Sequence, residues 1–196
     1  MADNKMKSDR RMGPAGSENW HAMLDGAEYI LREEGHARLT SRRIAECVGV
    51  KQRLVYYYFR SMDELIVDLF RRLSDRELQR LREASESRHA LRDIWNTNVS
   101  STDARLISEF MALANRLEGL KIEVIKFIQE SRAIEIEAIG AALARKSIPN
   151  SLPASALAIV AASVALTVSR EAQLGIDMGH ADIITVVEGF LAALEP

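Results

Sequence analysis

Residues Thr40 to Phe59 read TSRRIAECVGVKQRLVYYYF and contain two short apolar periods separated by Gly49. Each period has the spacing of one helix face, and the residues concerned are Ile44, Ala45 and Val48 in the first and Val55, Tyr58 and Phe59 in the second. Thr40 is placed to cap the first helix, and Gly49 can adopt the positive φ that a tight turn requires. The pattern predicts a helix-turn-helix.

The second helix of this motif presents a polar face that suits a DNA groove. Gln52 and Arg53 lie in its first turn, where Arg can pair with guanine and Gln with adenine. Leu54 is interpreted either as a contact to a thymine methyl group or as part of the core. Other side chains are predicted to contact the DNA backbone, namely Thr40, Arg42, Lys51, Tyr56, Tyr57 and Arg60.

At these residues the sequence resembles the TetR family of transcriptional regulators. The family signature runs Thr-x-x-x-Ile-Ala-x-x-Ala-Gly-Val-Ser-x-Gly-x-Leu-Tyr-x-Tyr-Phe-x-x-Lys-x-x-Leu. The positions that agree are Thr40, Ile44, Ala45, Gly49, Val50, Tyr56, Tyr58, Phe59 and Leu65. The positions that depart are Val48, Lys51, Arg53, Val55 and Met62, and the family usually has a phosphate-contacting Lys in place of Met62.

The resemblance implies an all-α protein in three parts. These are a flexible arm over residues 1–16, a helix-turn-helix domain over 17–61, and an effector-binding and dimerisation domain over 62–196. The family's function implies a homodimeric repressor that a small apolar effector releases from a palindromic double-stranded DNA operator. The alternatives are a ligand-independent regulator controlled by a protein partner and an enzyme or carrier on the same helical scaffold.

Composition and charge agree with a soluble DNA-binding protein. The 196 residues are 47% hydrophobic and 28% charged, which is ordinary for a globular chain. Although the net charge is −2, residues 1–62 hold 11 Lys and Arg against 8 Asp and Glu. This basic excess suits phosphate binding, and the alternative is a solvated charged face. The single cysteine, Cys47, excludes an intramolecular disulfide, fits a reducing cytoplasm and is predicted to be a half-buried filler.

The rest of the chain is predicted to be helical, with breaks at Ser100 and Ser101, near Gly119, at Ser147 to Pro153 and at Gly175 to Gly179. Ser61 and Glu64 form a capping box that begins a long helix joining the two domains. A helix over 117–146 has two apolar faces, and both are expected to be buried. The uncharged stretch 148–169 is too short for a membrane span, because Pro149 and Pro153 leave fewer than the ~20 residues that a bilayer requires.

The resemblance places a dimer interface on the last two long helices and an effector site on the central ones. The interface residues, whose alternative is burial in the chain's own core, are Ala158, Ala162, Ala165, Ser169, Val187, Phe190 and Leu191. The effector-site residues, whose alternative is also plain core, are Trp95, Phe110, Met111, Asn115, Phe127 and Thr167.

The sequence contains no pattern typical of catalysis. The four histidines lack metal-ligand spacing, and no phosphate-binding glycine loop or nucleophile motif occurs. The adjacent acidic pairs, Glu135 with Glu137 and Glu33 with Glu34, are interpreted as solvated charge. We therefore expect no enzymatic activity, no metal and no cofactor.

Overall fold

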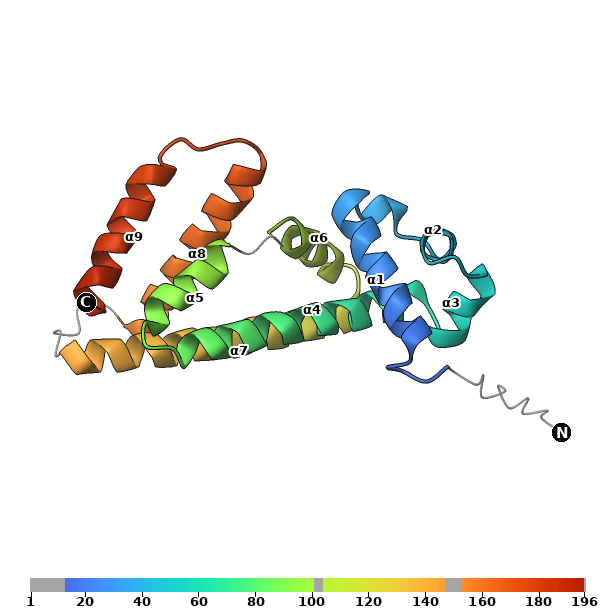
Figure 1. Ribbon diagram of the computed structural model, residues 1–196, viewed down its shortest axis with the longest axis horizontal. Helices are drawn as coiled ribbons and strands as arrows, with labels where there is room; N and C mark the ends of the chain where they lie inside the picture. The colour runs from blue at the N-terminus through green and yellow to red at the C-terminus, as the bar shows by residue number, and fades with distance from the viewer. Residues whose placement is uncertain (1–12, 101–103, 147–152, 196) are drawn as a thin grey trace. The chain divides into compact units, whose positions relative to one another are not determined.

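The computed structural model describes residues 13–100, 104–146 and 153–195, and within these ranges the regular elements are all helical. The all-α prediction is therefore confirmed. The elements are α1 (Glu18–Glu33), the 3-10 helix η1 (His36–Arg38), α2 (Ser41–Cys47), α3 (Gln52–Tyr58), α4 (Met62–Ser85), α5 (Ala90–Val99), α6 (Ala104–Ala114), α7 (Glu118–Lys146), α8 (Ala154–Gln173) and α9 (His180–Leu194) (Figure 1). The chain divides into two units, Met1–Phe70 and Arg71–Pro196, and the division falls inside α4.

In the first unit α1 packs on α2, and α2 packs on α3. Ser17 caps α1 by accepting a hydrogen bond from the Trp20 amide at 3.4 Å. A close approach between α1 and α2 requires glycine at position 26, because a Cβ there would lie 2.7 Å from Cγ1 of Val48. The buried face of α1, which includes Met23 and Leu24, supplies much of this unit's core.

The predicted capping box at the start of α4 is half correct. The Glu64 amide donates to Oγ of Ser61 at 3.1 Å, as expected. The Glu64 carboxylate, however, accepts from the amide of Arg60 at 2.6 Å instead of from the amide of Ser61. The helix that follows is continuous from Met62 to Ser85, which confirms one long helix at the junction of the two units.

In the second unit α7 packs against α5, α6, α8 and α9, and α5 also packs against α8. The main apolar cluster joins buried side chains of α5, α7, α8 and α9, namely Leu91, Trp95, Ala142, Ala165, Leu191 and Leu194. Figure 1 shows α8 and α9 running in opposite directions and joined by the loop over 174–179. This loop is the break that the sequence predicted at Gly175 to Gly179.

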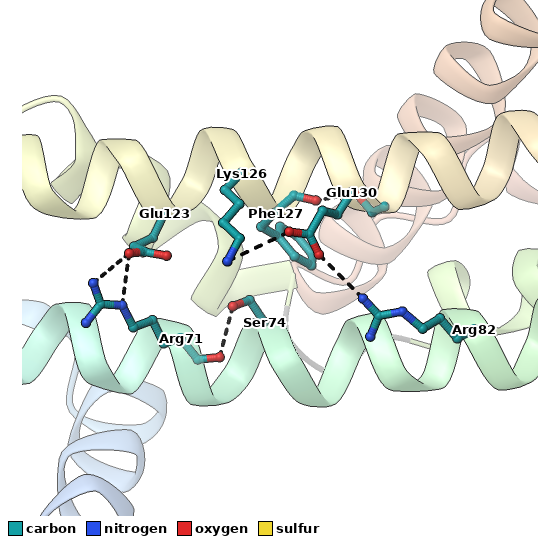
Figure 2. Close-up of polar contacts among 8 residues, drawn as sticks. Arg71, Ser74, Arg82, Glu123, Lys126, Phe127 and Glu130 are labelled. Carbon is teal, nitrogen blue, oxygen red and sulfur yellow. Dashed lines mark hydrogen bonds and ion pairs between the residues drawn. The ribbon is translucent and has the colours of Figure 1, made fainter. Parts of the chain in front are cut away.

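Ion pairs hold the second half of α4 against α7. Arg71 contacts Glu123 at 2.6 Å, and Arg82 contacts Glu130 at 3.4 Å. Figure 2 shows both arginines extending from α4 to the acidic side chains of α7, with Lys126 also reaching Glu130. The contacts join residues that are about 50 positions apart in sequence, so they record tertiary packing and not local helix pairing.

Hydrogen bonds hold helix α5 at both ends. At its start, the carboxylate of Glu195 accepts hydrogen bonds from the amides of Leu91 and Arg92 at 3.0 and 3.2 Å. A carboxylate at this position satisfies orphan amides and complements the helix dipole. At the other end, Oγ of Ser169 donates to the carbonyl of Val99 at 2.7 Å. Helices α8 and α9 therefore fix the position of α5.

Several sequence expectations need correction. The break placed near Gly119 lies over 115–117 instead, and Gly119 belongs to the first turn of α7. Only one face of α7 is buried in its first half, since Leu120 and Val124 are buried while Ile122 and Ile125 are 58% and 46% exposed. Both faces are apolar in composition, but described residues cover only the face that carries Leu120 and Val124.

Two further expectations about the first unit are also changed. Cys47 is exposed, because Ile44 and Ala45 occupy the buried face of α2. The part of the arm at Gly13 is docked, since its buried backbone N–H donates to the carbonyl of Tyr57 at 2.9 Å. The rest of the predicted arm, residues 1–12, lies outside the described residues.

Candidate DNA-binding surface and effector cavity

Local hydrogen bonds set the geometry of the helix-turn-helix. Oγ1 of Thr40 caps α2 by accepting from the Arg43 amide at 3.1 Å. Gly49 has a φ of 72°, which lets the chain turn between α2 and α3 without strain. The amide of Val50 then donates to the carbonyl of Ala45 at 2.9 Å and closes the turn. The predicted cap and the predicted glycine turn are both confirmed.

Helix α3 has one buried face and one exposed polar face. Val55, Tyr58 and Phe59 are buried, and the ring of Trp20 stacks on Phe59 with the centroids 6.1 Å apart. Leu54 is half-buried, a position between the two alternatives left open for it. The exposed side chains are those predicted to face DNA, namely Lys51, Gln52, Arg53, Tyr56, Tyr57 and Arg60.

A hydrogen-bonded chain that the sequence did not reveal orients part of this face. Nε2 of Gln52 donates to Oγ of Ser41 at 2.9 Å, and that hydroxyl donates to the hydroxyl of Tyr56 at 3.0 Å. Ser41 is only 5% exposed, so the first residue of α2 serves as a fixed anchor for two side chains of α3. The signal available in the sequence was a small hydroxyl residue beside the Thr40 cap.

Ion pairs engage two arginines of α2. Arg42 contacts Glu46 at 2.9 Å, but both side chains are well exposed and such a pair contributes little to stability. Arg43 forms a fork to both carboxylate oxygens of Glu34, and the shortest distance is 2.6 Å. Hydrogen bonding from Arg43 holds the pKa of Glu34 below its usual value. This second pair joins the end of α1 to α2 and steadies the motif.

Replacing Glu34 with Gln should make the stability of the first unit less sensitive to acid. Because the pKa of Glu34 is lowered by Arg43 in the folded state, the pair stabilises the fold above the carboxyl's unfolded pKa and loses this effect as the pH falls. Glu34→Gln should lower Tm at neutral pH and flatten the acid limb of a Tm–pH curve. The matched control is Glu33→Gln, because Glu33 is an exposed neighbour. Equal losses in both variants would contradict a specific role of the fork.

The second unit contains an apolar cavity of about 320 Å³ among α5, α7, α8 and α9. Apart from Asn98 and Glu135, its lining is apolar and consists of Leu91, Ile94, Trp95, Ile139, Leu157, Ala158, Val160, Ala161, Val164, Ile183, Val186, Val187, Phe190, Leu191 and Leu194. A volume of this size is at the lower end of the range for small-molecule sites. An apolar ligand with one or two polar groups would match it.

Of the six side chains predicted to contact an effector, only Trp95 lines this cavity. Thr167 lines a second cavity of about 320 Å³, beside the contact of 2.9 Å between His180 and Glu171. The remaining four line neither of these cavities: Phe110 is buried, Phe127 is half-buried, and Met111 and Asn115 are exposed. They lie on α6, just after it, and on α7, and apolar composition alone did not indicate which helix faces enclose space.

Glu135 is the polar residue of the cavity that sequence reasoning missed. It is 6% exposed, and its Oε1 accepts from Nδ2 of Asn98 at 3.0 Å. Nε of Arg132 lies 3.4 Å from Oε2. Burial raises the pKa of Glu135 despite these two neighbours. The interpretation of Glu135 as solvated charge is therefore wrong, and its spacing of four and seven residues from Ile139 and Ala142 was the signal for a shared face.

The seven residues predicted for a dimer interface are not equally accessible. Four are buried within the chain's own second unit, namely Ala158, Ala165, Ser169 and Leu191. Ala162 and Val187 are half-buried, and Phe190 is 46% exposed. The small side chains of α8 let α5 and α7 pack closely, so much of the stripe is used internally. The apolar surface left open on α8 and α9 includes Ile159, Leu166 and Val186.

Comparison with known proteins gives a family match for the first unit and a similar fold for most of the chain. Residues 23–69 match the family model for bacterial regulatory proteins of the tetR family. The fold is similar to a TetR transcription regulator from Haloarcula marismortui, with 16% identity over 88% of this chain and 95% of that one and a TM-score of 0.73. Residues 23–69 therefore match a family of DNA-binding regulators, whereas the likeness of the whole chain to the solved structure concerns the fold alone.

Two other solved structures have a similar fold. The fatty acid degradation regulator FadR from Bacillus halodurans has 14% identity, 93% and 97% coverage of the two chains and a TM-score of 0.67. FadR from Bacillus subtilis, solved with stearoyl-CoA, has 17% identity, 90% and 97% coverage and a TM-score of 0.64. No curated protein matches the sequence. The descriptions are those of regulators and not of enzymes.

Two further features of the chain bear on metal binding and on membrane association. Among the described residues, no group of His, Cys, Asp or Glu is arranged to hold a metal ion. One described helix, α8, is long and apolar enough to cross a membrane by length and composition alone. Its buried residues, which include Ala158 and Ala165, pack inside the second unit. We therefore interpret α8 as a packing helix of the unit.

Proposed function

We propose that this protein is a cytoplasmic, homodimeric repressor that binds a near-palindromic operator and is released by a small, largely apolar effector. The observation that carries the DNA-binding part is the exposed polar face of α3, with Lys51, Gln52 and Arg53 at its first turn. Two such helices about 34–36 Å apart would read successive major grooves.

Residue roles follow from the kind of DNA group that each side chain fits. Arg53 and Gln52 are proposed to read base edges, with Ser41 holding the Gln52 amide in place. Half-buried Leu54 can offer its exposed part to a thymine methyl group. The proposed phosphate contacts are Thr40, Arg42, Lys51, Tyr56, Tyr57 and Arg60. These contacts would position the helix without selecting a sequence.

The apolar cavity supports the proposal that an effector releases the protein from DNA. FadR from Bacillus subtilis was solved with stearoyl-CoA, so a chain of similar fold can hold a ligand with a long apolar part. Helix α7 contributes Glu135 to the cavity and Glu123 and Glu130 to the ion pairs with α4. Because α4 begins at Met62, directly after the helix-turn-helix, it is the covalent route by which a displaced α7 would act on DNA binding.

The test is selection of duplexes from a random DNA pool with the purified full-length protein at two salt concentrations. We expect enrichment of an inverted repeat whose binding survives added salt better than binding of random duplex, because base contacts depend less on counterion release than phosphate contacts do. Enrichment of a single half-site would contradict the dimeric part of the proposal. Binding that is sequence-blind at both salt concentrations would contradict specific recognition.

A further inference from the structure

The cavity of the second unit contains one buried acidic group in an otherwise apolar wall. Glu135 is the only charged residue among the described side chains that line it, and it is 6% exposed. A buried carboxylate destabilises a fold unless other groups compensate its charge. The groups that contact the Glu135 carboxylate therefore indicate which further group the cavity could bind.

The partners of Glu135 among the described residues are one side-chain amide and one guanidinium group. Asn98 donates one neutral hydrogen bond to Oε1 at 3.0 Å. Among the described residues, Arg132 is the cationic neighbour of Glu135, and its Nε stands 3.4 Å from Oε2, longer than a charge-assisted hydrogen bond. An ionised carboxylate has about four acceptor sites on its two oxygens, so several remain for a donor that enters from the cavity.

We propose that the cavity binds a protonated amine carried on an apolar body, with Glu135 as the counter-charge and Asn98 as a second polar contact. The inference rests on the proposed ligand-responsive function and adds the chemical class of the effector. The apolar side chains around the cavity, such as Trp95 and Ile139, would enclose the body of the ligand. A ligand that placed a carboxylate in the cavity would instead meet the Glu135 charge and be disfavoured.

The raised pKa of Glu135 supports this assignment. Burial disfavours the ionised carboxyl, whereas an ammonium group beside it would favour ionisation. The charged group facing it on its own helix is Arg132, and α5 contributes the neutral Asn98. Affinity for an amine should therefore fall as the pH is lowered through the raised pKa of Glu135, before an ordinary carboxyl would be protonated. A neutral alcohol should show no such fall.

The probes are decylamine, decanol and decanoate, which share one apolar chain and differ in the head group. Isothermal titration of the full-length protein is made at neutral pH, below the micelle concentration of each probe. The affinity should be highest for decylamine, lower for decanol and lowest for decanoate. Glu135→Gln should weaken decylamine binding by about ten- to a hundredfold, because a charge-assisted contact is lost, and leave decanol binding nearly unchanged. Glu137→Gln is the matched control, since Glu137 is exposed on the same helix.

A second readout separates recognition from a structural role. Because burial raises the pKa of Glu135 in the folded state, the ionised carboxylate lowers stability at neutral pH, and Glu135→Gln should unfold at the same or a higher temperature. A large fall in Tm would mean that Glu135 mainly supports the fold, and it would overturn the assignment. Ala161→Phe, which adds volume to the cavity wall, should weaken all three probes if they bind there.

The outcomes distinguish this inference from the function on which it rests. Decylamine binding that is no tighter than decanol binding would overturn the amine assignment. A preference for decylamine that Glu137→Gln removes as fully as Glu135→Gln would do the same. In either case, selection of an operator from the random pool would still support DNA recognition. Decylamine binding that depends on Glu135 but leaves operator affinity unchanged would support the assignment and contradict ligand-responsive release. Tighter binding of decanoate would overturn the assignment in favour of an anionic effector.

Discussion

Replacing Ile159 with Glu should abolish the proposed dimer and lower the affinity for an inverted-repeat operator by about 10²- to 10⁴-fold. Ile159 is 52% exposed on the open apolar surface of α8, which we propose contacts the partner protomer, and it does not line the apolar cavity, so a charge there leaves the ligand site in place. An unpaired carboxylate in an apolar interface is strongly unfavourable. A monomer would then lose the gain in affinity that comes from linking two half-site contacts.

The measurement is sedimentation or light scattering for the oligomeric state, together with titration of operator DNA and of a single half-site. Ala141→Glu is the matched control because it adds the same charge at an exposed position of α7. We expect Ile159→Glu to bind the half-site as the unchanged protein does. A dimeric Ile159→Glu protein with full operator affinity would place the interface elsewhere on the chain.

The helix-turn-helix was predictable because its determinants are local. The Thr40 cap, the Gly49 turn and the apolar spacing that buries Val55 all act within 20 residues of one another. Hydrogen bonds between elements were less accessible to the same reasoning. The placement of Ser41 between Gln52 and Tyr56 depends on how α2 crosses α3, and no spacing within either helix reports that crossing.

The cavity could not be placed from the sequence, because its walls come from four helices that are distant in the chain. Glu135 and Asn98 are 37 residues apart, and only packing of α5 on α7 brings them together. Glu137, which lies two positions further on and is exposed, made the pair resemble a solvated surface. A residue's burial depends on the neighbour that covers it, and that neighbour is not encoded in the residue's own helix.

The small side chains of α8 show the same limit for interfaces. Alanine at positions 158 and 165 permits close packing of another helix, whether that helix belongs to the same chain or to a partner. In the structure these positions face the chain's own core, and Ser169 uses its hydroxyl on the Val99 carbonyl. Larger exposed residues such as Ile159 are therefore better candidates for contact between protomers than the small ones.

Replacing Arg53 with Ala should lower operator affinity and relax sequence preference at one base pair in each half-site. A bidentate contact from Arg to guanine discriminates by about 1–3 kcal/mol, so two half-sites together would lose about 2–6 kcal/mol on the preferred sequence. Arg53 is exposed in the first turn of α3, where this contact is geometrically available. Selection from a random pool should then return the inverted repeat with one position per half-site degenerate.

The informative comparison is Lys51→Ala, which removes a charge from the residue that caps the same helix. Because a phosphate contact carries no base information, Lys51→Ala should weaken preferred and altered operators by the same factor. It should also reduce the slope of log affinity against log salt by about one for each half-site. If Arg53→Ala likewise weakened all sequences equally and kept the selected motif intact, Arg53 would be a phosphate contact, and base reading would fall to Gln52 and Leu54.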